Sequence, residues 1–334
     1  VEPSEPRGTP DHLAHPDRWP ASVDLDRLGL LPEIDWASGI ADAWDPGEAA
    51  ASDRLEEFLA TTAADYKEGR DAIPADLTSR LSPHLWFGEI SVRRAYADAL
   101  ESRRRRRNEE ARTSIDEWLR QLGWRDFAHG MLAHFPETLT EPMQEKFEGF
   151  PWREDPEGLK AWQRGRTGYP IVDAAMRCLW TTGWMHNRLR MIVASFLCKD
   201  LLIHWHEGAR WFEHTLVDAD LANNRFGWQW TAGCGADAAP FFRIFNPITQ
   251  GKKFDPEGVF VRKWVDEITD LDDRYIHEPW EADDAELEAA GVSLDEAARE
   301  VKYAGDRTPG RYPPPIIDHA DARDRALDAW DQVK

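Results

Sequence analysis

The sequence predicts an all-α fold. Apolar residues recur at helical spacing in most segments, and the alternating apolar and polar runs that form half-buried strands are nearly absent. Hydrophobic residues make up 42% of the chain and charged residues 31%, a balance typical of globular proteins. A chain of 334 residues is also long enough to bury a large core.

Helices are predicted along the first 132 residues after an initial linker. Residues 1 to about 45 are rich in proline, aspartate and tryptophan, and the Asp-Pro-Gly sequence at 45–47 predicts a turn that closes this linker. Helical spacing then covers residues 48–68, 84–100 and 115–132, with a polar loop at 76–83. The arginine run at 103–107 favours a solvated surface segment.

The second half of the chain continues the helical pattern. Residues 159–180 predict a helix, a glycine turn at 165–168 and a second helix that has Pro170 in its first turn. Residues 185–206 contain neither glycine nor proline and predict one long helix. A further helical segment, 207–217, follows after a break at a glycine.

Charge is distributed unevenly. The net charge is −21, yet residues 160–264 hold fourteen basic against nine acidic side chains. A basic centre inside an acidic remainder is compatible with nucleic acid docking at one face, although binding would depend strongly on salt.

Cysteine usage and hydropathy limit the cellular compartments in which this protein is expected. The three cysteines are too few for a disulfide framework or a zinc knuckle, so we expect a reducing compartment, the cytoplasm by default. No apolar run reaches 18 residues, so no membrane association is expected. The N-terminus lacks the apolar core of a signal peptide and does not begin with Met, so we expect the chain to begin inside a longer protein.

The most informative polar residues lie between 183 and 264. Asn187, Arg190 and Met191 share one helix face, and a buried guanidinium requires a carboxylate, for which Asp218 and Asp220 are candidates. The two acids either cap the next helix or accept hydrogen bonds from a bound ligand. Both interpretations stay open.

Tryptophan is unusually frequent, with 17 residues. Most indoles are expected to pack in the core, but their mixture with acids, amides and arginines indicates a flavin site with redox-active tryptophans. No metal site is expected, because His204 and His206 point to different sides of a helix.

Residues 183–264 closely resemble the flavin-binding half of class I cyclobutane pyrimidine dimer photolyases, in the cryptochrome/photolyase family. Further matches are Tyr66 with Arg70, TSRLS at 78, SPHLWFGEIS at 82, AWQRGRTGYPIVDAAMR at 161 and YPPPIIDHADAR at 312. The resemblance implies an interdomain linker remnant at 1–45 and a helical FAD-binding catalytic domain at 46–334. The family's N-terminal α/β antenna domain is absent from this chain, so the antenna pigment stays unknown.

The resemblance also implies the residues that hold FAD. They are Tyr66, Thr78, Ser79, Arg80, Leu81, Ser82, Trp118, Arg125, Arg190, Asp218, Ala219, Asp220 and Asn224. Among them, Asn224 would lie near flavin N5 and Arg190 would pair with Asp218.

Electron transfer and repair are implied in the same way. A photoreduction relay would run from Trp228 through Trp205 to Trp152 at the surface. Damaged DNA that holds a pyrimidine dimer would be the partner of a monomeric protein. The residues that would face the DNA are Arg70, Gln121, Trp124, Arg125, Asn187, Arg188, Met191 and Trp230.

Gln121 departs from the class I pattern, in which a glutamate contacts the dimer. We expect the neutral amide to donate a hydrogen bond to the dimer as it becomes negatively charged, without supplying a proton or a charge. Repair is therefore expected to be impaired or altered. A blue-light photoreceptor without repair activity is one alternative. A (6-4) photolyase is the other alternative. The histidine pair of those enzymes would fall at Asn187 and Met191, and neither is a histidine here, which disfavours this alternative.

Overall fold

A computed structural model of the chain describes residues 16–30, 34–237, 242–300 and 309–334, together with residues 3–6, 8 and 12. Several residues of the predicted linker, namely 1, 2, 7, 9–11, 13–15 and 31–33, lie outside the described residues. The end of that linker forms a short 3-10 helix, Leu25–Leu28, and α1, Ser38–Ala43, which contacts α8. The Trp44 indole donates a hydrogen bond to the carbonyl oxygen of Thr182 at 2.8 Å and fixes the linker there.

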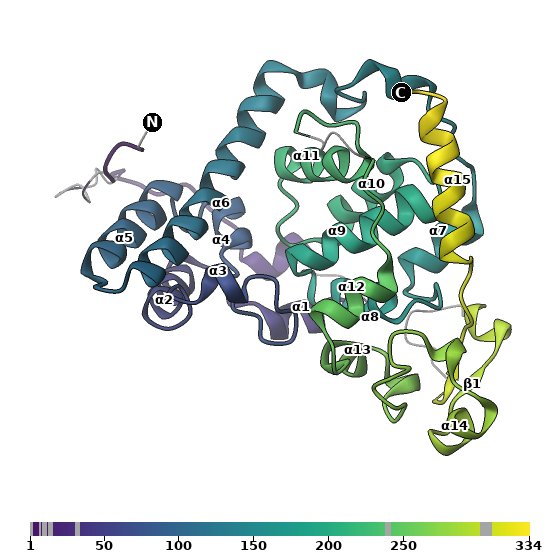
Figure 1. The fold of residues 1–334 in the computed structure, drawn as a ribbon. Helices are drawn as coiled ribbons and strands as arrows, with labels where there is room; N and C mark the ends of the chain where they lie inside the picture. The colour runs from purple at the N-terminus through teal and green to yellow at the C-terminus, as the bar shows by residue number, and fades with distance from the viewer. Residues whose placement is uncertain are drawn as a thin grey trace.

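The chain then forms a group of helices that we call the N-terminal cluster, seen on the left of Figure 1. It consists of α2 (Glu48–Ala60), α3 (Tyr66–Gly69), α4 (Ser82–Phe87), α5 (Val92–Arg105) and α6 (Glu109–His134). Leu55 of α2 and Ile115 of α6 are buried at its centre. Each such burial contributes roughly 1.5–3 kcal/mol relative to exposure.

Two helices predicted in this cluster are shorter than expected. The segment 48–68 is interrupted, because the amide of Ala63 bonds back to Phe58 and ends α2, and Tyr66 then packs on the Phe58 ring at 6.0 Å. The segment 84–100 is also interrupted: Gly88 adopts φ 74°, and the hydroxyl of Ser91 caps α5.

The remainder forms what we call the C-terminal core. Its helices are α7 (Pro156–Gln163), α8 (Pro170–Thr182), α9 (Asn187–Ser195), α10 (Trp205–Thr215), α11 (Leu221–Ala232), α12 (Pro247–Phe254), α13 (Val259–Trp264), α14 (Asp284–Ala289) and α15 (His319–Asp331). The predicted helix–turn–helix at 159–180 is confirmed by α7 and α8. In Figure 1 the last helix, α15, lies on the opposite side of the molecule from α5.

The predicted long helix at 185–206 is wrong. After α9 the backbone widens into a five-residue π-helix, Phe196–Asp200, and Leu202 then adopts φ 56° before α10 begins at Trp205. Gly208, where a break was expected, lies inside α10. Its missing side chain makes room for Trp228, since a Cβ there would lie 2.0 Å from the indole.

Short 3-10 helices and two small strands complete the described structure. The 3-10 helices are Pro136–Leu139, Glu145–Gly149, Asp266–Ile268, Pro279–Glu281 and Glu296–Arg299. The strands β1 (Ser293–Leu294) and β2 (Arg311–Tyr312) pair in parallel. The predicted all-α fold is confirmed, because these two-residue strands are the only ones that the described residues form.

Candidate functional site

Two adjoining cavities lie between the N-terminal cluster and the C-terminal core. We call them the inner cavity, of about 300 Å³, and the outer cavity, of about 480 Å³. Both volumes fall in the range of small-molecule sites. The cavities share their lining at Gln121, Arg125, Asn187, Arg190, Asp218 and Asn223.

A strained, hydroxyl-rich loop forms one wall of the inner cavity. Asp76 and Arg80 have φ values of 42° and 50°, a region that residues with a side chain seldom occupy. The Asp76 carboxylate stabilises this shape by accepting hydrogen bonds from the Thr78 hydroxyl at 2.7 Å and from Arg80 Nε at 2.5 Å. These hydrogen bonds hold the loop in the strained shape in which Thr78, Ser79 and Ser82 line the cavity.

Aromatic side chains support that loop from both sides. The Arg80 guanidinium lies 4.6 Å from the centre of the Trp184 ring, and the Trp118 indole donates to the Ser79 hydroxyl at 3.2 Å. Tyr66 lines the same cavity, and burial raises the pKa of its phenol, so it stays a hydrogen-bond donor at neutral pH.

The opposite wall carries the predicted pair of Arg190 and Asp218. Arg190 Nη2 donates to both Asp218 oxygens, at 3.0 and 2.8 Å, and its Nε donates to the carbonyl oxygen of Met185. Both oxygens of the almost fully buried Asp218 side chain are therefore paired with one nitrogen of Arg190. The expected ion pair is present.

Asp220 fills the first of the two roles that the sequence left open, the cap of the next helix, and also pairs with Arg125. Its Oδ1 caps α11 by accepting from the amide of Asn223 at 2.8 Å, and its Oδ2 accepts from Arg125 Nη1 at 2.7 Å. The side chain also lines the inner cavity. The pair of Arg125 and Asp220 thus connects the N-terminal cluster to the C-terminal core across the site.

The outer cavity has aromatic walls and amide edges. Trp124 and Trp230 line it together with Asn187 and Met191, and Phe226 stacks on Trp124 at 6.4 Å. Asn224 also lines this cavity, while its Nδ2 donates to the carbonyl oxygen of Ala209 on α10 at 2.9 Å. Its carbonyl oxygen remains available to a ligand.

Of the three indoles predicted to form a relay, one lines the outer cavity. Trp228 lines it and is buried against Phe212 at 5.0 Å. Trp205 is buried, and the His204 ring contacts both Trp205, at 5.7 Å, and the partly exposed Trp152, at 5.1 Å. The sequence did not indicate that His204 occupies this position.

Two of the residues predicted to hold FAD or to face DNA line neither cavity. Ala219 packs against the core, and Arg188 donates to Asp71 at 2.5 Å while its guanidinium lies over the Phe254 ring. Conversely, the predicted set omitted Asn223 and Trp184, which both line the inner cavity. For Asn223, its position beside the predicted Asn224 in the sequence was the available signal.

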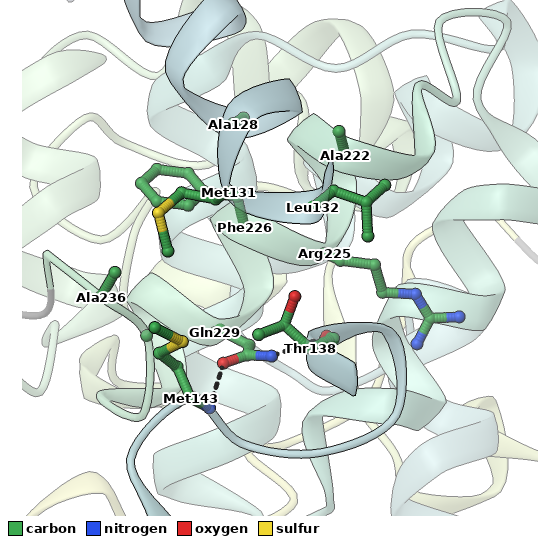
Figure 2. Close-up of a pocket in the computed structure, with 11 residues that line it drawn as sticks. Ala128, Met131, Leu132, Thr138, Met143, Ala222, Arg225, Phe226, Gln229 and Ala236 are labelled. Carbon is green, nitrogen blue, oxygen red and sulfur yellow. Dashed lines mark hydrogen bonds between the residues drawn. The ribbon is translucent and has the colours of Figure 1, made fainter. Parts of the chain in front are cut away.

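A much smaller pocket of about 20 Å³ lies between α6 and α11. Figure 2 shows Gln229 reaching from α11 to Met143 and Thr138, whose amide and carbonyl groups it bonds at 2.9 and 2.8 Å. The pocket is too small for an organic ligand. The hydrogen bonds of Gln229 instead hold α11 in place, and α11 carries residues that line both cavities.

The two large cavities suit FAD. Hydroxyls and a guanidinium on the 78–82 loop match the polar chain of the dinucleotide, and carboxylates with amide groups on the opposite wall match a flat ring with polar edges. The charges of Arg125 with Asp220 and of Arg190 with Asp218 already neutralise each other within the protein. A large polar aromatic molecule can therefore bind without leaving any of these charges buried and unpaired.

Comparisons with known proteins agree with this geometry. Residues 118–332 match a family model described as the FAD binding domain of DNA photolyase. The chain is 47% identical over its whole length to a deoxyribodipyrimidine photo-lyase of Agrobacterium fabrum, of which it covers 66%. It is 42% identical to cryptochrome-1 of Sinapis alba, over 83% of this chain and 56% of that protein.

A solved structure is similar over the entire chain. It is a bacterial class III photolyase from Agrobacterium tumefaciens, with a TM-score of 0.89 and 46% identity, and this chain covers 66% of it. The chain thus spans between about half and two thirds of the length of these relatives. It belongs to the photolyase and cryptochrome family and contains that family's FAD-binding domain.

Proposed function

We propose that this chain forms the FAD-binding catalytic part of an enzyme that repairs cyclobutane pyrimidine dimers in DNA under light. The outer cavity carries this proposal. It opens beside the cavity suited to FAD and has Trp124 and Trp230 as stacking walls, with polar groups at Gln121 and Asn187. A flipped-out dimer has faces that stack on indoles and polar edges, and it leaves the helix at low cost because its stacking is impaired.

Reduced FAD, when bound and excited by light, supplies the electron that opens the dimer ring. The protein's part is to hold and position. Arg190 with Asp218 and Arg125 with Asp220 set the shared wall, the 78–82 loop holds the polar chain of the cofactor, and Asn224 presents its carbonyl oxygen to the ring. Trp124 and Trp230 exclude water from the faces of the dimer.

The electron relay through Trp228, Trp205 and Trp152 is part of the same proposal. Burial supports the outer end of this order, because Trp228 and Trp205 are buried and Trp152 is partly exposed. Ring contacts join Trp205 to Trp152 through His204, so we extend the proposed relay to include that imidazole.

The resemblance to class I photolyases does not establish which class of photolyase this chain belongs to. The similar solved structure is named a class III photolyase, which supports placing this chain beside that class. The proposed repair of cyclobutane dimers does not depend on this assignment.

Repair is tested with purified protein that carries chemically reduced FAD. The protein is irradiated with an oligonucleotide that holds one thymine dimer, and restored thymines are counted by chromatography. We expect restoration that requires light and bound FAD. FAD-loaded protein that restores no thymine would contradict the proposal.

A photoreceptor without repair activity is the second candidate. Two arginines expected to face DNA are neutralised by carboxylates, Arg70 by Glu117 at 2.6 Å and Arg188 by Asp71 at 2.5 Å. Such pairing weakens attraction to phosphate. Light-dependent reduction of FAD without any thymine restored would favour this candidate.

A further inference from the structure

Gln121 and Glu117 form a connected pair on α6 that the sequence did not reveal. They lie one turn apart, and Gln121 Nε2 donates both to the backbone oxygen of Glu117 at 3.0 Å and to its carboxylate Oε1 at 3.3 Å. An amide nitrogen has two hydrogens to donate. Both are used inside the protein.

The Glu117 carboxylate is itself fixed. Arg70 Nη1 donates to Oε1 at 2.6 Å, and Arg120 Nη1 donates to Oε2 at 2.5 Å. Both guanidinium groups donate to it, so the carboxylate is the acceptor in this network. The reverse orientation of Gln121 would place its carbonyl oxygen against two acceptors, so the network selects the orientation with Nε2 toward Glu117.

This orientation leaves the carbonyl oxygen as the only free hydrogen-bonding atom of Gln121, on a side chain that lines both cavities. Building on the proposed repair function, we propose that Glu117 is a positioning residue. It makes Gln121 present an acceptor to the base, and so selects dimers that carry an imide N–H, as thymine and uracil rings do. The expectation that Gln121 donates to the dimer is therefore replaced.

The chain offers a matched control on the same helix. Asp116 carries the same charge as Glu117 but pairs with Arg103 of α5, at 2.6 and 2.8 Å, and lines neither cavity. Glu117→Gln and Asp116→Asn each remove one negative charge, so both should strengthen binding to undamaged DNA similarly. Only Glu117→Gln also removes the carboxylate that accepts from the Gln121 amide.

The test is binding in the dark by FAD-loaded protein, measured by fluorescence anisotropy. The probes are three oligonucleotides: one with a thymine dimer, one with the N3-methylated dimer, and one undamaged. We expect the wild type and Asp116→Asn to prefer the N–H dimer over the N-methyl dimer by about fivefold, the value of one hydrogen bond. Glu117→Gln should reduce this preference to less than about twofold.

The outcomes separate the two proposals. Equal affinity of the wild type for damaged and undamaged DNA would contradict the repair function and this inference with it. A wild type that prefers the dimer but treats both dimer probes alike, or a Glu117→Gln variant that discriminates as the wild type does, would overturn the inference alone. Flavin absorbance and thermal unfolding check that each variant is folded. If Glu117→Gln does not retain FAD, Glu117→Asp is tested instead, since it keeps the charge and shortens the side chain by one methylene.

Discussion

The N-terminal cluster and the C-terminal core face each other across the same cavities but are stabilised differently. The fully buried residues of the cluster are mostly apolar, and several of its ion pairs, such as Arg94 with Asp98, are exposed to solvent. The core instead encloses charged side chains, among them Asp173, Lys199 and Glu267. Apolar burial tolerates small losses, whereas an enclosed charge requires its partner, so the core should be far more sensitive to single changes.

The largest expected difference concerns electron transfer. Trp205→Phe in the core should abolish photoreduction of oxidised FAD, because the proposed relay loses its middle indole, while repair by chemically reduced protein continues. Trp124→Phe in the cluster should leave photoreduction intact and weaken dimer binding. Flash absorption spectroscopy and thymine restoration measure the two effects. Equal photoreduction in all three proteins would remove the relay assignment.

Next is the loss of a buried ion pair. Glu267 accepts from Arg177 Nη1 at 2.6 Å with both side chains buried, so Glu267→Ala should lower the free energy of unfolding by about 3–5 kcal/mol. Asp98→Ala in the cluster breaks an exposed pair four residues apart and should cost only about 0.3–0.5 kcal/mol. Urea denaturation compares them, and similar costs would contradict the proposed difference.

Acid should affect the core through His186. The pKa of this histidine is lowered to about 4, mainly because the side chain is buried. Its Nδ1 caps α9 by accepting a hydrogen bond from the amide of Arg188. A pKa lowered on folding means that the unfolded chain binds the proton first, so stability falls as pH decreases from about 6.5 to 4, by on the order of 3 kcal/mol.

His186→Asn keeps a capping side chain and should remove most of this pH dependence. His134→Asn, at an exposed position at the end of α6, is the control. Unfolding free energies measured across this pH range check the expectation. A His186→Asn variant as acid-sensitive as the control would show that another group is responsible.

The smallest effects concern glycines within helices. Gly208→Ala in α10 would place a Cβ against the Trp228 ring and should destabilise the core by roughly 1–3 kcal/mol. Gly130→Ala in α6 meets no atom within 4 Å and should stabilise the protein by about 1 kcal/mol, the difference in helix propensity. Thermal unfolding distinguishes opposite signs directly, and shifts of the same sign would contradict the packing described for Trp228.

Much of the site was predictable from local sequence. The spacing of Asn187, Arg190 and Met191 placed them on one helix face, and the same residues line the outer cavity. The requirement of a buried guanidinium for a carboxylate left Asp218 and Asp220 as candidates, and the family resemblance implied the pair of Arg190 and Asp218 that is present. Glu117 was missed, because its importance lies in hydrogen bonds to Arg70 and Gln121 that no pattern in the sequence indicates.

The sequence by itself determined the helical fold class, through apolar spacing, and most of the side chains that line the cavities. Only the tertiary structure decided where helices end, as in the π-helix after Ser195, because packing overrides local preference there. It also decided that Asp220 both caps α11 and binds Arg125, and which way the Gln121 amide points. These choices depend on partners distant in the chain or on competition between nearby groups, and both are settled only when the two regions pack together.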